Sequence, residues 1–474
     1  MPRRGCLVLV LLASISVGAA AAPGDDDQRL IDAAKQQDLP RVRALVAQKV
    51  DPNAPQPDGA TALHWAVHWD DLAMTDVLLA AGARVSVAND LGVTPLALAC
   101  ENGNGVIVDR LLARGADPNA AFPGRPPALM LCVRSGSVAG VKAMIARRAN
   151  VNGREPLRGQ TALMWAAANA QQEIVRALLV AGADVRARSQ LTHLTVNRAD
   201  PNDIYTGVVG EIPGGRSTPL LFAAAGGSAE ITKLLLDAGA DANEASPAGE
   251  SALLIAVHSG HDDCATLLLQ RGADPNASGA GYTALHAAVL RGSAGMVRTL
   301  LARGAGVDPR IAHGTTTIRA GRGFVLPETL VGGTPFLLAA KFLDLDIARQ
   351  LVAAGADPRA GLADGTTALM LAAGLFETGP LFDRRERILV QPDTGEPAAL
   401  DMVQWVLGLG GDVNSVNVRG DTALHGAAAH GYRTVVQALI ARGAQVDIKN
   451  AKGATAFDVG DARVKDLLVG RGRG

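Results

Sequence analysis

The chain has 474 residues, of which 48% are hydrophobic but only 3% are aromatic, and its net charge at pH 7 is −1. A near-neutral chain has no overall basic field, which argues against nucleic acid as a partner. A core so poor in rings has to be built from small aliphatic residues, which disfavours a large β-sandwich and favours closely packed helices. Four cysteines are too few for a dense disulfide framework in a chain of this length.

The first residues have the composition of a secretory signal peptide. Arg3 and Arg4 precede an apolar, Ala-rich run that ends at Ala22. We expect residues 1–21 to be removed, so that the mature chain is exported and lies in the periplasm or outside the cell. The alternative is an uncleaved anchor, because an apolar run of about 17 residues lies at the lower limit for a membrane-spanning helix.

A short pattern, Thr-Ala-Leu or Thr-Pro-Leu followed by three mostly apolar residues, recurs along the rest of the chain. Thr or Ser before such a run caps a helix, and the Leu-Leu-x-x-Gly-Ala-Asp pattern that follows most copies predicts an amphipathic second helix ended by glycine. Most successive copies are 32 to 34 residues apart. The copies begin at Thr61, Thr94, Pro127 (a degenerate copy), Thr161, Thr218, Ser251, Thr283, Thr334, Thr367 and Thr422.

These recurring residues resemble the signature of the ankyrin-repeat family over nearly all of the chain after the signal segment. The resemblance implies a mainly α fold, a solenoid of stacked helix-turn-helix units with β-hairpin fingers over residues 22–474. We expect about ten full repeats between two caps, which we place at Asp27–Asn53 and Gly453–Val469. Since stability in such folds comes from stacking of neighbours, the repeats form one continuous core.

Three intervals exceed the repeat period, and the extra residues fall at about 189–215, 310–333 and 376–397. The first two lengthen the turn between successive repeats, and their β-branched stretches predict long hairpins. The third lies between the two helices of one repeat. Long loops in a compact protein are usually functional or disordered. The three insertions therefore either contact a partner or are surface loops without a binding role.

His64 and His68 are four residues apart, a spacing that can place two zinc ligands on one helix face. The Glu of the zinc-protease motif is missing, however, and no third ligand is evident. His64 also occupies the same repeat position as His286 and His425, where the family resemblance implies a ring that ties turns together. We therefore interpret these histidines as structural and expect no metal and no cofactor.

The segment His258–Cys264 also has the composition of a metal site, but its Gly-His pair matches the ordinary family turn between helices. Cys264 falls on the apolar face of a second helix, which predicts a buried structural thiol. Cys100 and Cys132 lie in adjacent first helices at successive rather than equivalent positions. We expect both of them to be free thiols.

The positions seven and eight residues after each Thr vary more than the positions around them. In the ankyrin family partners usually contact the concave face and the finger tips, so the resemblance implies partner contacts there. A second position, four residues after the Thr, carries Trp65. Exposed aromatic and arginine side chains are the usual anchors of protein interfaces; for Trp65 the alternative is that its ring fills space between repeats. The candidates are Trp65, His68, Trp69, Glu101, Arg134, Asn169, His258, Arg291, Phe342 and His430.

We therefore expect an exported, monomeric scaffold that binds a protein partner through its concave face, fingers and insertions and is not an enzyme. One alternative is a membrane-tethered scaffold or a regulatory subunit of an exported enzyme, and membrane association would require an uncleaved first segment. The other is a metal-dependent enzyme, whose site would be built from the insertions and the histidines of the groove.

Overall fold

The computed structural model describes residues 25–200, 203–313, 330–375, 381–382, 389–390 and 395–469. The predicted signal segment and most of the second and third insertions lie outside these residues. The described part is mainly helical, with 24 helices and two two-stranded sheets. The chain divides into two compact units, one made of residues 1–123 with 139–149 and the other of residues 124–138 with 150–474. We describe each unit by itself.

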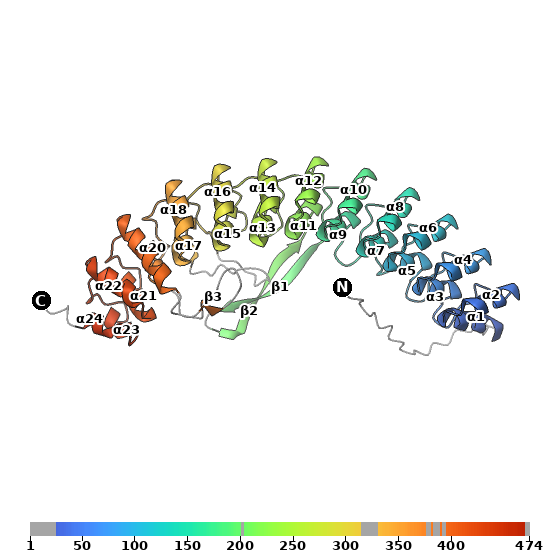
Figure 1. The fold of residues 1–474 in the computed structure, drawn as a ribbon, viewed down its shortest axis with the longest axis horizontal. Helices are drawn as coiled ribbons and strands as arrows, with labels where there is room; N and C mark the ends of the chain where they lie inside the picture. The colour runs from blue at the N-terminus through green and yellow to red at the C-terminus, as the bar shows by residue number, and fades with distance from the viewer. Residues whose placement is uncertain are drawn as a thin grey trace. The chain divides into compact units, whose positions relative to one another are not determined.

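The first unit consists of short helices joined by tight turns. The N-terminal helix pair, coloured dark blue in Figure 1, lies in the segment where we placed the first cap. The helices are α1 (Asp25–Lys35), α2 (Leu39–Ala47), α3 (Ala62–His68), α4 (Leu72–Ala80), α5 (Pro95–Asn102), α6 (Gly105–Ala113) and, from its second residue onward, α8 (Val138–Ala146).

Local sequence fixes where these helices begin and end. The Thr94 hydroxyl oxygen accepts a hydrogen bond from the Ala97 N–H at 3.1 Å, and the Asp71 carboxylate caps α4 through the Met74 N–H at 2.9 Å. Gly82, just beyond α4, has a φ of 88°, a left-handed conformation that a Cβ would penalise. These caps satisfy backbone groups that short helices would otherwise leave unpaired.

The second unit repeats the same arrangement, and each first helix packs against the first helix of the next repeat, as α9 does against α11 and α13 against α15. In chain order the 24 described helices form twelve pairs, which agrees with about ten repeats and two caps. The helices are α7 (Ala128–Arg134), α9 (Ala162–Ala168), α10 (Gln172–Val180), α11 (Pro219–Gly226), α12 (Ala229–Asp237), α13 (Ala252–Ser259), α14 (Asp262–Gln270), α15 (Ala284–Leu290), α16 (Ala294–Ala302), α17 (Pro335–Lys341), α18 (Leu345–Ala353), α19 (Ala368–Ala372), α20 (Glu396–Gly408), α21 (Ala423–His430), α22 (Arg433–Ala441), α23 (Ala456–Val459) and α24 (Lys465–Leu468).

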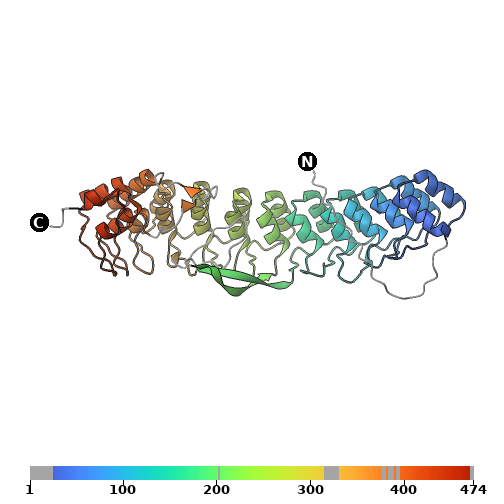
Figure 2. The ribbon, with the colours of Figure 1, turned by 90° about the horizontal axis from the view of Figure 1, so that it is seen from below.

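The first insertion is a long β-hairpin, as its β-branched stretches predicted. Strand β1 (Leu191–Asp200) pairs antiparallel with β2 (Asp203–Gly215), in a register that opposes Leu191 to Gly215 and Asp200 to Asp203. The hairpin is inserted between α10 and α11 (Figure 1). It lies on the same side of the helices as the turns that join successive repeats (Figure 2).

The other two insertions are described only in part. At the ends of the second, the Ile311 N–H donates to the Gly333 carbonyl oxygen at 3.0 Å, and the Gly332 N–H donates to that of Ile311 at 2.8 Å. Its predicted hairpin falls on residues 314–329, outside the described part. The third insertion lies between α19 and α20, as expected, and contributes two short paired strands, β3 (Leu381–Phe382) and β4 (Leu389–Val390).

The core is built from Ala, Leu, Val, Ile and Met, with Phe336 the largest fully buried side chain of the described residues. Cys264 is a buried free thiol, as predicted. The expectation for the other two cysteines is wrong, since Cys100 and Cys132 are each disulfide-bonded. Position within the repeat was a poor guide, because a disulfide requires that the Cα atoms of two cysteines lie within about 7 Å in the folded chain, whatever their positions along the helices.

Candidate protein-binding surface

All ten candidate residues lie near the C-terminal ends of first helices, and each keeps part of its surface exposed. This position follows from the capping Thr, which fixes the start of a helix of only seven or eight residues. The varied positions, seven and eight residues after the Thr, therefore fall in the last turn of the first helix or directly after that helix. The first unit holds Trp65 and His68 in α3, Trp69 at the C-cap of α3, and Glu101 in α5.

Three of these residues form an aromatic cluster on α3, which we call the α3 cluster: Trp65, His68 and Trp69. The two indole rings lie 6.5 Å apart between centroids, and the His68 ring packs edge-on against Trp65 at 5.7 Å and Trp69 at 4.8 Å. Offset and edge-to-face contacts of this kind hold rings in defined positions. Trp69 nevertheless keeps 42% of its surface exposed.

Polar contacts fix the inner ring of the cluster. The Trp65 indole N–H donates to the Gln56 side-chain oxygen at 3.1 Å, and the Lys35 ammonium lies 5.3 Å from the ring centroid of Trp65, a cation–π geometry. Trp65 is thus partly packed between its neighbours, whereas Trp69 faces solvent. Sequence reasoning missed Gln56 and Lys35, since neither occupies a varied position of the repeat.

The next repeat holds the end of α3 in place. The Asn102 amide donates to the carbonyl oxygens of Val67 at 2.7 Å and His68 at 3.3 Å. These carbonyls belong to the last turn of α3, where backbone acceptors lack partners within the helix. The α3 cluster is therefore attached to a helix end that the next repeat holds by hydrogen bonds.

The second unit brings two of its candidates together. Arg291, at the C-cap of α15, donates through Nη1 to the carbonyl oxygen of His258 in α13 at 3.0 Å. The His258 ring contacts the Tyr282 hydroxyl at 3.2 Å through Nδ1. Tyr282 lies just before a capping Thr and is almost fully buried, so its participation could not be predicted from the varied positions.

The remaining candidates lie on separate helices of the second unit. Arg134 ends α7, and Asn169 caps α9 with its amide donating to the Trp165 carbonyl oxygen at 2.8 Å. Phe342 caps α17, and His430 ends α21, where its ring lies 5.2 Å from that of Tyr432. Burial lowers the pKa of His430, which favours a neutral imidazole.

The histidines three residues after a capping Thr connect neighbouring repeats through hydrogen bonds, as predicted. The Thr61 N–H donates to His64 Nδ1 at 3.0 Å, and His64 Nε2 lies 3.1 Å from the carbonyl oxygen of Val93 in the next repeat. With both ring nitrogens occupied, His64 has none left for a metal ion. Among the described residues, no group of three or more His, Cys, Asp or Glu side chains is placed to hold one.

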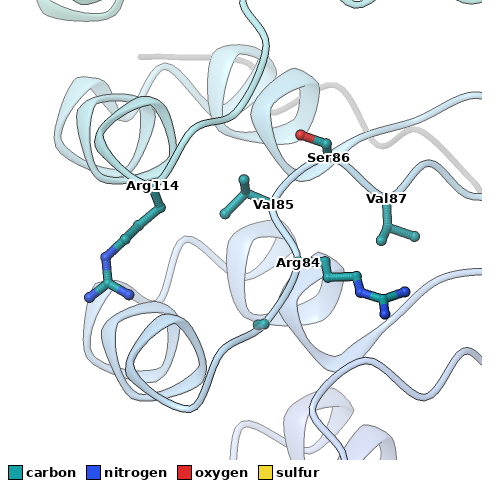
Figure 3. A pocket seen from close by; sticks show the side chains of 6 residues that line it. Arg84, Val85, Ser86, Val87 and Arg114 are labelled. Carbon is teal, nitrogen blue, oxygen red and sulfur yellow. The ribbon is translucent and has the colours of Figure 1, made fainter.

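The first unit also has a hollow of about 460 Å³ at the turn after α4, lined by Ala83, Arg84, Val85, Ser86, Val87 and Arg114. Figure 3 shows the Arg84 and Arg114 side chains pointing away from each other, and Arg114 donates to the Leu79 carbonyl oxygen at 2.6 Å. Its polar groups do not converge, and none of the ten candidates lines it. We therefore do not assign a ligand site there.

Helix pairs that recur at one repeat length and stack on their neighbours define a helical repeat protein. The profile of ankyrin repeats in three copies matches residues 30–122, 123–189, 190–279 and 220–313, and the profile of a single ankyrin repeat matches residues 419–451. Because these matches cover more than half of the chain, the protein belongs to the ankyrin-repeat family. Ankyrin repeats are modules for protein–protein interaction.

Curated relatives share parts of this array. Human ankyrin repeat and SOCS box protein 16 is 29% identical over 233 residues, which are 45% of this chain and 48% of the relative. The Arabidopsis thaliana E3 ubiquitin-protein ligase XBAT33 is 46% identical over 91 residues, 19% of this chain and 18% of the relative. The chain thus spans less than half the length of each of these two proteins.

Among solved structures, the ankyrin repeat domain of human ASB11 is 27% identical and aligns with a TM-score of 0.41. The alignment covers 52% of this chain and 98% of that domain. In the part of this chain that the structure describes, no helix is both long enough and apolar enough to cross a membrane.

Proposed function

We propose that the protein is exported and binds a protein partner through the ends of its first helices, the turns between repeats and the insertions, without catalytic turnover. The α3 cluster carries this proposal. Trp69 is a large aromatic residue that is 42% exposed and is attached to a helix end held by Asn102. Tryptophan is enriched among the few residues that supply most of the binding energy of protein interfaces.

A fixed surface also lowers the cost of binding. Association has to offset the entropy lost when interface side chains and loops become ordered. The ring contacts of Trp69 and the hydrogen bonds to the end of α3 already restrict this part of the surface in the free protein. The candidates on α13 and α15 are restricted in the same way by the bond between Arg291 and His258.

Two features support export. Residues 1–21 have the composition of a signal peptide, and Cys100 and Cys132 are each disulfide-bonded, a state that persists mainly in oxidising compartments. Intact mass measured on protein from the source cells tests this part of the proposal. We expect a mature N-terminus at Ala22, whereas a retained first segment would support the membrane-tethered alternative.

The partner-binding part is tested by affinity capture from the exported fraction of the source cells. Wild-type protein is compared with Trp69→Ala and Arg134→Ala, one variant for each unit. We expect each variant to recover at least tenfold less of a specific partner, because each loses an exposed anchor while the buried residues of α3 and α7 are unchanged.

Matched controls remove exposed side chains from second helices. Val106→Ala in α6 and Val180→Ala in α10 truncate residues that are 53% and 91% exposed and lie outside the varied positions. Capture by both controls should equal that of the wild type. Equal recovery by all four variants would show that the first-helix ends are not the binding surface.

A further inference from the structure

Five exposed arginines gather where the β1–β2 hairpin joins the second unit, and we call them the arginine cluster. They come from three segments that are separate in the sequence: the turn before α9, the turn after α10, and the residue that follows β2. All five side chains are exposed. The cluster consists of Arg154, Arg158, Arg186, Arg188 and Arg216.

Hydrogen bonds hold these segments side by side. Arg154 Nη1 donates to the Arg188 carbonyl oxygen at 2.6 Å, and Arg188 Nη1 donates to that of Arg216 at 3.2 Å. The Gln190 N–H donates to the Arg158 carbonyl oxygen at 2.8 Å, and the Gln190 carbonyl accepts from the Arg216 N–H at 3.2 Å. The cluster is therefore built by tertiary contacts that connect one arginine-bearing segment to the next.

The positive charge of the cluster is poorly balanced. The guanidinium bonds of Arg154, Arg186 and Arg188 go to carbonyl oxygens, which carry no net charge. Among the described residues, the one carboxylate in an ion pair with a guanidinium of the cluster is that of Glu244, at 4.0 Å from Arg188. The Asp184 carboxylate accepts only the backbone N–H of Arg186, at 2.9 Å. Guanidiniums that lack a carboxylate partner attract an anion that offers several carboxylates.

Glu155 lies within the cluster but forms no ion pair with the guanidiniums that the structure describes. Its carboxylate is buried and accepts the backbone N–H groups of Leu157 and Arg158, both at 2.7 Å, and that of Gln160 at 3.1 Å. The guanidiniums of Arg158 and Arg216 have no hydrogen bond to any residue that the structure describes. Both are therefore available to a ligand.

The adjoining hairpin leaves backbone groups open. β1 and β2 form a two-stranded sheet, so each strand has one edge that is not paired with another described strand. Such an edge accepts a further extended chain.

We propose that the arginine cluster and the adjoining hairpin edge form a binding site for an extended acidic segment of a protein partner. Carboxylates of the segment pair with the guanidiniums, and its backbone adds a strand at the hairpin. This site lies in the turns and the insertion that the proposed function includes, and it therefore rests on that function. It is separate from the first-helix ends, so the two surfaces can be tested and can fail independently.

An acidic peptide fits this site better than a nucleic acid does. The turns that follow on the same edge carry the exposed carboxylates of Asp241 and Asp274, and the whole chain has a net charge of −1. A long polyanion that ran along the edge would meet these like charges, whereas a short acidic segment ends before them. Nucleic-acid sites instead require a continuous basic track.

The test uses the full chain and a fluorescein-labelled ten-residue peptide of alternating Glu and Thr, with binding followed by anisotropy. The variant Arg158→Ala/Arg216→Asn removes the two free guanidiniums; Asn suits position 216, where φ is 46°. We expect binding to weaken at least tenfold in this variant. Circular dichroism melting verifies that it folds.

The charge-matched control is Arg176→Ala/Arg349→Ala, which removes two exposed arginines from the second helices α10 and α18. Its affinity should stay within twofold of the wild type. A peptide of the same sequence with alternate backbone amides methylated should bind at least tenfold more weakly, because it cannot complete a strand. Equal binding by both double variants would overturn the proposal, as would tighter binding of a 20-base-pair DNA duplex than of the acidic peptide.

Discussion

His286 and Gly333 lie 47 residues apart in the chain, yet His286 Nε2 is 3.3 Å from the Gly333 carbonyl oxygen. In repeats of ordinary length the same bond spans 29 residues, as from His64 to Val93. In each case the acceptor is the residue before the next capping Thr. The second insertion therefore lies, in the sequence, between two residues that are in contact, and this contact between repeats is the same as in repeats of ordinary length.

His286 makes the stability of the protein depend on pH. Burial lowers the pKa of His286 from 6.5 to about 4, so between these values the unfolded chain binds a proton that the folded chain does not. The contribution of the neutral His286 ring to the free energy of unfolding is therefore fully present above about pH 6.5. As the pH falls towards 4, the free energy of unfolding decreases by about 3 kcal/mol. Urea unfolding of the wild type and of His286→Asn at pH 7 and pH 5 measures this loss. The variant should be less stable at pH 7 and should lose less on acidification; an equal loss in both would contradict the prediction.

Two glycines with similar backbone conformations should respond differently to alanine. Gly249 and Gly239 have φ values of 78° and 92°, so alanine costs about 1–2 kcal/mol at either position. At Gly249 a Cβ would also collide with the backbone of Gly279, whereas at Gly239 no atom lies within 4 Å. Thermal unfolding should show that Gly249→Ala is clearly less stable than Gly239→Ala. Equal melting temperatures would mean that the two turns do not pack as described.

Asn276 links two successive turns. Its amide donates to the Gly304 carbonyl oxygen at 3.0 Å, and its side-chain oxygen accepts the Gly306 N–H at 2.7 Å. Asn276→Ala should lower the free energy of unfolding by about 1–2 kcal/mol, since each net hydrogen bond contributes about 1 kcal/mol. Urea titration measures the change. Ser278→Ala, two residues further along, is the control and should match the wild type.

Thiol titration tests the state of the cysteines in the chain from Ala22 onward. Cys264 is buried, and burial raises the pKa of its thiol, so both access and reactivity are reduced. A thiol reagent such as Ellman's should find no reactive thiol in the native protein and one after unfolding without reductant. After reduction it should find three, since Cys100 and Cys132 are then released. Three thiols without reductant would contradict the disulfide-bonded state.

The sequence predicted the repeats, their boundaries and the first hairpin, because the signals for these features are local. A capping Thr, a Leu-Leu pair and a terminal Gly act within one helix or one turn, and each recurs often enough to set the register. The position of the candidate contacts at the ends of first helices follows from the same register, since a fixed start and a fixed length determine the last turn.

Contacts between segments far apart in the sequence were not predictable in this way. The expectation of free thiols at Cys100 and Cys132 failed because it compared positions along helices rather than distances between them. The hydrogen bond between Trp65 and Gln56 was missed for a related reason, since Gln56 lies in the turn before α3, outside the varied positions of the repeat.

What the sequence by itself determined is the architecture, because helix caps and apolar periodicity act over a few residues and repeat. Only the tertiary structure decided which side chains meet. Arg158 and Arg216 are 58 positions apart in numbering and are joined through Gln190 by the pairing at the base of the hairpin. A charged surface of this kind depends on how turns lie side by side, and no property of either turn alone contains that information.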